Sequence, residues 1–224
     1  MPPKPSTRYV APPGPETDCQ PGSRGRVLCN LLGVTKKRVM DQMEFEALLR
    51  AQLEYAENRI FTDTRFTADL LRQMHRDWLG GLYAWAGRYR SVNLSKGGFL
   101  WPPAHLVPSH MEAFEVTLLR QRTPCRGCSP EEAVKRMAEV HGELLLIHPF
   151  REGNGRLARW LADLMALQAN LPAPDYGLAG RDSTSRKERY LAAVRRAYVR
   201  DYRRLIDFFA EAVERALRAA GAGR

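Results

Sequence analysis

The sequence predicts an all-helical fold with one short β-hairpin. Apolar residues recur at helical spacing in most segments after residue 26, and Ser129 and Ser185 begin two helix-capping patterns. Only residues 88–101 alternate polar and apolar side chains. With 224 residues and 44% hydrophobic residues, the chain can bury one sizeable core, so we expect one main domain.

The N-terminal half contains an arm, two helices and the hairpin. Residues 1–25 include seven prolines and no hydrophobic periodicity, which is typical of a flexible Pro-rich arm. Helical patterns follow over residues 40–60 and 67–79. The alternating segment 88–101 has a glycine pair near its middle, so we expect a hairpin or an extended flap.

A capping box opens the next helix, which we expect over residues 129–147. Ser129 is followed by Pro130 at the first helical position and by Glu132, the carboxylate of the box. The apolar side chains of this helix form one stripe, which predicts that the helix faces a core. The stripe consists of Ala133, Met137, Val140, Leu144 and Ile147.

Further helices complete the expected fold. One begins just after Gly155 and ends by Asn170, because apolar residues recur at helical spacing between them. Another begins with the capping pattern at Ser185 and extends to about Val199, and residues 201–220 form the last helix.

Composition limits the classes of function. The chain has 35 Lys and Arg against 25 Asp and Glu, a net charge of +10, which favours nucleic acid, acidic protein surfaces or polyanions such as nucleotides as partners. No apolar run approaches the ~18–20 residues of a membrane span, and the N-terminus lacks the apolar core of a secretory signal. We therefore expect a soluble, cytoplasmic protein without a membrane partner.

The four cysteines indicate neither a zinc site nor a disulfide framework. Cys125 and Cys128 form one CxxC pair in a polar loop, while Cys19 and Cys29 are far away in sequence. We expect the CxxC segment to be a surface turn rather than a metal or redox site.

The stretch 147–159, IHPFREGNGRLAR, concentrates the residues that carry chemistry. A proline ends the preceding helix at or about His148, so the stretch is a loop that leads into the N-terminus of a helix. Gly153, Asn154 and Gly155 allow successive backbone N–H groups to point at one anion, which predicts a phosphate site.

The charged residues of the stretch extend this site. Arg156 and Arg159 are three residues apart on the helix, so both can reach further phosphates of one ligand. Glu152 fits beside phosphates if it binds Mg²⁺, which commonly takes one carboxylate together with phosphate oxygens and water. His148 can titrate near neutral pH and is the candidate general base. Together these residues predict phosphoryl or nucleotidyl transfer.

The order of these residues resembles the Fic motif: a histidine, a phenylalanine two residues on, an acidic residue, GNGR and a second arginine. Residues 28–35, 82–99 and 189–209 also resemble parts of a Fic domain, so the resemblance covers residues 26–210. Residues 211–224 remain as a helix end and tail. The motif is filled by His148, Phe150, Glu152, Gly153, Asn154, Gly155, Arg156 and Arg159.

The resemblance implies an all-helical Fic-type fold that transfers AMP from ATP to a Tyr, Thr or Ser hydroxyl of a target protein. It implies that His148 takes the hydroxyl proton and that Glu152 holds Mg²⁺ on the α and β phosphates. The glycine amides and Asn154 would bind phosphate, and Arg156 and Arg159 would hold the β and γ groups.

The resemblance also assigns roles outside the motif. The hairpin would lie beside the catalytic histidine and pair through its backbone with a segment of the target protein. Tyr190 would border the adenine, whereas we expect His141 to be structural and Phe150 to be a core anchor. The target-docking residues of the flap would be Ser95, Lys96, Gly97, Gly98 and Phe99.

Many Fic proteins carry an inhibitory helix in which Ser or Thr stands four residues before a glutamate and Gly or Asn follows it. The only counterpart here is Glu57 with Asn58, and Leu53 replaces the Ser or Thr. We therefore expect weak restraint by Glu57 at best, or restraint by a separate small antitoxin-like protein.

The sequence also allows other activities. The family allows UMP or phosphocholine transfer, AMP removal, and delivery into another cell as an effector. Charge alone suggests a basic nucleic-acid-binding module, but we expect the arginine-rich residues 195–204 to form a solvated helix face, so nucleic acid is not the expected partner.

Overall fold

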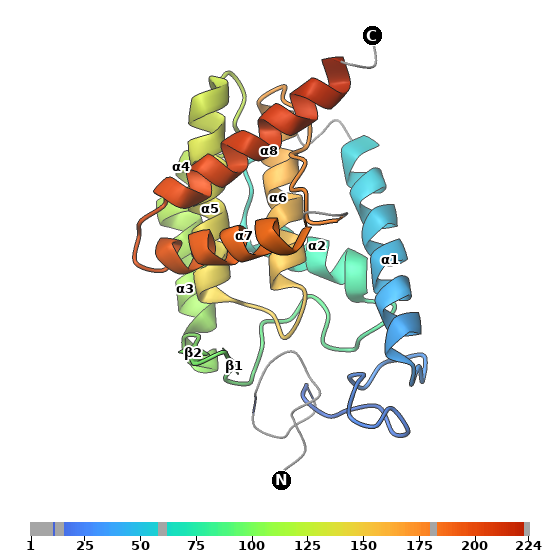
Figure 1. Cartoon of the computed structure of the whole chain (residues 1–224). Helices are drawn as coiled ribbons and strands as arrows, with labels where there is room; N and C mark the ends of the chain where they lie inside the picture. The colour runs from blue at the N-terminus through green and yellow to red at the C-terminus, as the bar shows by residue number, and fades with distance from the viewer. Residues whose placement is uncertain (1–10, 12–15, 58–61, 180–182, 222–224) are drawn as a thin grey trace. The chain divides into compact units, whose positions relative to one another are not determined.

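The structure is a computed structural model, which describes residue 11 and residues 16–57, 62–179 and 183–221. Its helices and one small hairpin confirm the predicted fold class (Figure 1). Among the described helices, none combines the length and the apolar composition needed to cross a bilayer.

The chain divides into two compact units that interleave along the sequence. The residues expected for one domain, 26–210, contribute to both units, and the boundaries of that domain stay a prediction. Unit 1 comprises residues 1–57, 68–112 and 147–157, and unit 2 comprises residues 58–67, 113–146 and 158–224.

In unit 1, helix α1 (Lys37–Glu57) packs against helix α2 (Ala68–Leu79), and the two are neighbours in Figure 1. Tyr55 of α1 donates a hydrogen bond to Asp77 of α2 (2.6 Å). Both helices agree with the sequence prediction to within a few residues, but residues 58–60 of the first prediction lie outside the described residues.

The flap contains a hairpin of β1 (Ser95–Lys96) and β2 (Phe99–Leu100). Gly97 and Gly98 form its turn with φ of +57° and +80°, the positive values that a two-residue type I′ turn requires. The paired strands are much shorter than the alternating segment 88–101. The flanks of the hairpin are buried in a small core that contains Val92, Leu94 and Trp101.

The segment after the flap is helical, which the sequence did not predict. Prolines at 102, 103 and 108 obscure the helical pattern, yet Pro108 lies in the first turn of α3, where a missing N–H is tolerated. The elements are a 3₁₀ turn η2 (Ala104–Leu106), α3 (Val107–Phe114), a π-helical segment η3 (Glu115–Leu119) and α4 (Arg120–Arg122).

Helices α5 (Pro130–Ile147) and α6 (Asn154–Gln168) lie mostly in unit 2. The predicted cap is confirmed, because the Ser129 hydroxyl accepts a hydrogen bond from the Glu132 N–H (3.3 Å). The predicted apolar stripe of α5 is buried throughout, which confirms that it faces a core.

Helix α7 (Ser183–Ala197) packs against helix α8 (Arg203–Gly221), also in unit 2 (Figure 1). The prediction that Ser185 caps α7 is wrong, because Ser185 lies inside the helix and a capping side chain must precede it. Several consecutive Ser and Thr residues fit the capping pattern equally well, so the sequence did not distinguish them.

The described part of the N-terminal arm makes contacts, although we expected a flexible segment. The Glu16 carboxylate accepts hydrogen bonds from the N–H (3.1 Å) and hydroxyl (3.0 Å) of Ser91, and its carbonyl oxygen accepts one from Arg151 Nε (2.9 Å). Residues 1–10 and 12–15 of the arm lie outside the described residues.

Candidate active site

The predicted active-site loop joins α5 to α6 over residues 148–153. His148 has a φ of +52°, an uncommon conformation for a non-glycine residue that the surroundings must stabilise. Gly153 has a φ of +83°, and a Cβ at this position would lie 2.7 Å from the ring of Trp78. Both the backbone and the packing therefore require glycine at 153.

A buried arginine that no sequence motif identified, Arg90, stabilises this backbone. Its N–H donates to the carbonyl of Pro149 (2.9 Å), and its Nε donates to the carbonyl of His148 (2.8 Å). The other guanidinium nitrogens donate to the carbonyls of Val92 (2.9 Å) and Pro102 (2.6 Å). Burial lowers the pKa of Arg90 to about 10, so it remains charged at neutral pH.

The Asn154 side chain closes the loop. It is 1% exposed, its Oδ1 accepts a hydrogen bond from the Phe150 N–H (2.9 Å), and its Nδ2 donates to the Phe150 carbonyl (2.7 Å). This side chain therefore maintains the loop, and the contact of Asn154 with phosphate stays a prediction that its backbone N–H can fulfil. The anion-binding groups left at this helix start are the backbone N–H groups of Gly153, Asn154 and Gly155.

Phe150 is fully buried, which confirms its expected place in the core, and its ring stacks on His75 with centroids 4.0 Å apart. His75 Nδ1 accepts a hydrogen bond from the Gly87 N–H (2.9 Å), so the proton of the ring is on Nε2 and donates to the Glu152 carbonyl (3.1 Å). Burial lowers the pKa of His75 to about 4, which keeps this support neutral at pH 7.

The candidate base, His148, lies against the end of the flap. Its ring stacks on Trp101, which follows β2, with centroids 4.1 Å apart and planes 29° apart. His148 is 5% exposed and Trp101 is 7% exposed. The structure therefore places the predicted flap beside the predicted base, through a tryptophan that the sequence did not single out.

Glu152 is the carboxylate expected to bind Mg²⁺. Its side chain is 14% exposed, Oε1 lies 3.9 Å from Arg151 Nη1, and Oε2 accepts a hydrogen bond from the Gly153 N–H (3.3 Å). Among the described residues, no three His, Cys, Asp or Glu side chains form a group that can hold a metal. The donor set fits a Mg²⁺ ion that takes one carboxylate and completes its shell with phosphate and water.

Arg156, the first motif arginine, has a carboxylate partner in unit 1. Its Nη1 lies 2.7 Å from Oε2 of Glu44 on α1, and its guanidinium lies over the Trp78 ring, 4.6 Å from the centroid. Glu44 is 8% exposed and also accepts a hydrogen bond from the Tyr83 hydroxyl (2.6 Å). The predicted phosphate ligand thus already neutralises a buried carboxylate.

The second motif arginine, Arg159, belongs to unit 2 and has aromatic neighbours. Its guanidinium carbon lies 6.0 Å from the ring centroids of both Tyr176 and Tyr190. The Tyr190 hydroxyl is 2.8 Å from His141 Nε2. Burial lowers the pKa of His141 to about 3, in keeping with the structural role expected for it. That Tyr190 borders adenine stays a prediction.

The remaining predicted residues are exposed or partly buried. Lys96, Gly97 and Gly98 are exposed, and Ser95 and Phe99 are partly buried, so the hairpin is accessible from solvent. Glu57 is exposed at the end of α1, and Asn58 lies outside the described residues.

Comparisons with known proteins show which family this chain resembles. Residues 65–166 match the profile of the Fic/DOC family. The protein adenylyltransferase VbhT of Bartonella schoenbuchensis is 29% identical over 152 residues, which cover 68% of this chain and 30% of that protein. The protein adenylyltransferase Fic of Nematostella vectensis is 28% identical over 192 residues, which cover 84% of this chain and 42% of that protein. This chain spans less than half the length of either relative.

Solved structures agree on the fold. BepC of Bartonella tribocorum, determined with bound AMPPNP, superposes with a TM-score of 0.68 at 19% identity over 83% of this chain and 91% of that one. Fic-1 from C. elegans superposes with a TM-score of 0.64 at 25% identity over 84% of this chain and 54% of that one.

Proposed function

Because residues 65–166 match the Fic/DOC family, we propose that the chain belongs to this family and is a protein adenylyltransferase, which moves AMP from ATP to a Tyr, Thr or Ser hydroxyl of a target protein and releases pyrophosphate. The names of VbhT and the Nematostella protein carry this activity, and BepC binds the ATP analogue AMPPNP. The single observation that carries the proposal is the loop 148–153, which runs from a histidine to the N-terminus of α6.

His148 is the proposed general base. Its ring accepts the hydroxyl proton while the hydroxyl oxygen bonds to the α-phosphorus, and the bond to the oxygen that bridges to the β-phosphate breaks. Arg90 supports this role because it binds the His148 carbonyl, which fixes the position from which the ring projects. General-base catalysis typically contributes about 10²- to 10⁴-fold in rate.

The nucleotide would be held by the start of α6. The N–H groups of Gly153, Asn154 and Gly155 bind phosphate at the positive end of the helix dipole. Arg156 and Arg159 hold the β and γ groups, and Tyr190 borders the adenine. Preorganised donors of this kind lower the barrier because they need no reorganisation as charge develops.

Glu152 would hold Mg²⁺ on the α and β phosphates. The ion, when bound, neutralises charge on the phosphates. The chain itself would orient this carboxylate. The hydrogen bond from the Gly153 N–H to the Glu152 carboxylate and the contact of His75 with the Glu152 carbonyl support this orientation.

The flap residues Ser95, Lys96, Gly97, Gly98 and Phe99 would dock the target. Their accessibility and the Trp101 contact to His148 support a target segment that pairs with the hairpin backbone beside the base. The proposal also includes an N-terminal arm ahead of a domain at 26–210 and a small antitoxin-like inhibitor. It places the protein in the cytoplasm, with delivery into another cell as an effector.

The test uses ATP labelled at the α or γ phosphate, with Mg²⁺ and a cell lysate. We expect label from the α position on protein and none from the γ position. His148→Ala should abolish the label while ATP binding persists, because the base acts on the hydroxyl and not on the nucleotide. Label from γ, or wild-type rates in His148→Ala, would exclude the proposal. UTP and CDP-choline, tested in parallel, separate it from UMP or phosphocholine transfer.

The nucleic-acid alternative has less support. In the arginine-rich segment 195–204, Asp201 binds Arg196 (2.8 Å) and Arg203 (2.9 Å), so part of its charge is neutralised locally. The remaining arginines fit a solvated helix face.

A further inference from the structure

Tyr176 lies in unit 2, in a segment that contains no recognised motif, and its hydroxyl contacts α6. Its hydroxyl oxygen lies 2.7 Å from Asp163 Oδ1 and 3.1 Å from the carbonyl oxygen of Arg159. A phenol has one proton, so these two acceptors share it. Asp163 and Arg159 lie one turn apart on the same helix. The Tyr176 hydroxyl therefore bridges the backbone carbonyl of Arg159 and the carboxylate of Asp163.

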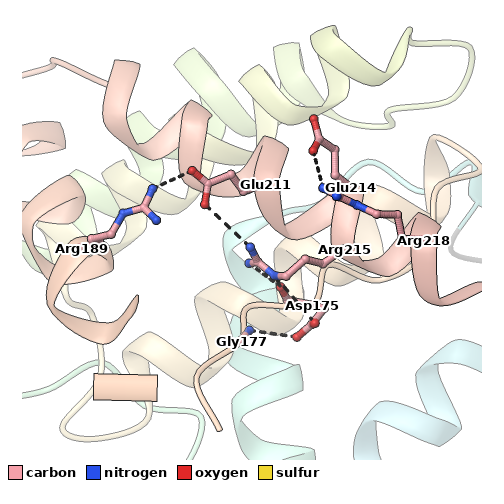
Figure 2. A network of polar contacts seen from close by, with 7 residues as sticks. All are labelled: Asp175, Gly177, Arg189, Glu211, Glu214, Arg215 and Arg218. Atoms are coloured by element: carbon pink, nitrogen blue, oxygen red, sulfur yellow. Dashed lines mark hydrogen bonds and ion pairs between the residues drawn. The ribbon is translucent and has the colours of Figure 1, made fainter. Parts of the chain in front are cut away.

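The residue before Tyr176, Asp175, is hydrogen-bonded to helix α8. Asp175 donates its N–H to the Ala212 carbonyl (3.0 Å), and its own carbonyl accepts two hydrogen bonds from Arg215 (2.7 and 3.0 Å). The Asp175 carboxylate accepts the Gly177 N–H (2.9 Å), as Figure 2 shows. This network places the Tyr176 ring by its backbone rather than by packing alone.

The guanidinium of Arg159 contacts aromatic rings, and these contacts do not use its N–H donors. The rings of Tyr176 and Tyr190 each lie 6.0 Å from its central carbon, a distance at which an aromatic face attracts a cation. Within the part of the chain that the structure describes, this guanidinium makes no hydrogen bond and no ion pair. Its N–H groups therefore remain available to a ligand.

We propose that Tyr176, tied to Asp163, is a positioning residue that directs the Arg159 donors toward the terminal phosphates of the nucleotide. The inference rests on the proposed function, in which ATP is the donor and Arg159 binds beyond the α-phosphate. It predicts that Tyr176 affects the binding of ATP but not of AMP, and only when Arg159 is present.

The test is a double-mutant cycle on the full chain, with the affinities for ATP and AMP measured by calorimetry. Tyr176→Phe should weaken ATP binding by about five- to tenfold, the effect of one net hydrogen bond, and leave AMP binding unchanged. In the Arg159→Ala background the same substitution should have no further effect on ATP. Equal weakening of AMP, or a full effect in the Arg159→Ala background, overturns the inference.

Conservative and control variants complete the cycle. Asp163→Ala should reproduce the loss in Tyr176→Phe, whereas Asp163→Asn should retain most ATP affinity because its amide oxygen still accepts the bond. Tyr202→Phe removes a comparable tyrosine–carboxylate bond, to Glu143, in the same unit and should change neither affinity. A loss of ATP affinity in Tyr202→Phe as large as that in Tyr176→Phe overturns the inference.

Failure of the proposed function gives a different result. If ATP binding shows the expected cycle but no α-label reaches protein, the transfer activity is excluded and the positioning role stands. If the wild-type protein binds ATP no more tightly than AMP, the positioning role is excluded.

Discussion

Arg156 and Arg159 are adjacent on the same face of α6, yet unit 1 and unit 2 give them different surroundings. Arg156 is paired with the buried carboxylate of Glu44 at 2.7 Å. The guanidinium carbon of Arg159 lies 6.0 Å from the centroids of two tyrosine rings. A carboxylate engages the donors of an arginine, whereas a ring attracts the cation and leaves the donors available. The same residue type at motif spacing thus has a competing carboxylate partner at one position and has its donors available to a ligand at the other.

The largest expected effect is a loss of activity when Arg159 is replaced, with little loss of stability. Arg159→Ala should lower kcat/KM for ATP by about 10²-fold or more, because it removes charge-assisted hydrogen bonds to phosphate. Its free energy of unfolding should change by less than about 1 kcal/mol, a typical surface value. Steady-state kinetics and urea unfolding measure both quantities. If Arg159→Ala instead unfolds the protein as readily as Arg156→Ala does, the comparison between the two sites fails.

A smaller effect is expected when the carboxylate of Glu44, the partner of Arg156, is replaced. Glu44→Gln should lower the free energy of unfolding by about 1–3 kcal/mol, because it removes the charge that pairs with Arg156 in a largely buried setting. It should also tighten ATP binding, since Arg156 no longer has a competing anion.

Glu57→Gln is the matched control for this experiment, because Glu57 is on the same helix and is exposed. It should change neither stability nor ATP affinity appreciably. A gain of self-modification of about tenfold or more, equivalent to roughly 1.4 kcal/mol, in Glu57→Gly would show that α1 restrains the enzyme through its end rather than through Glu44.

The smallest effect concerns pH in the surroundings of Arg159. Burial raises the pKa of Asp163 to about 7, above its ordinary value of 3.8. The folded protein therefore keeps a proton that the unfolded chain releases, so this stabilising contribution is complete below pH 3.8 and is lost as the pH rises through about 7.

The stability of the wild type relative to Asp163→Asn should therefore fall by about 1–2 kcal/mol between pH 6 and pH 8. Comparison with Asp163→Asn cancels the pH dependence of other groups, such as His75 and His141. Urea unfolding at several pH values measures the difference. A difference that stays constant over this range would show that Asp163 does not titrate near pH 7 in the folded protein.

Local signals accounted for what could be predicted from the sequence. The Gly97–Gly98 pair predicted a turn, and Ser129 with Glu132 predicted a helix start, because each depends only on neighbours in the chain. The loop between α5 and α6 could be placed for the same reason.

The remainder depends on contacts between distant segments. Arg90 binds a carbonyl that is 58 residues later, and Glu44 meets Arg156 from another helix, so no spacing rule reveals either. Asn154 was assigned to phosphate by resemblance, and the bonds of its side chain to the Phe150 backbone four residues earlier could not be read from the motif. Residue type predicts which bonds a side chain can form, and packing decides which of them it forms.

The four-way binding of Arg90 has a consequence for local opening. One guanidinium, with its backbone N–H, bonds to the residues on both flanks of the hairpin and to His148 and Pro149. Separating any of these segments leaves the buried Arg90 guanidinium without some of its acceptors, which costs free energy. The segments therefore open together as one cooperative unit. In hydrogen exchange, the amides at the base of the flap and those of the loop should therefore share one protection factor, and a target peptide that orders the flap should slow exchange in both.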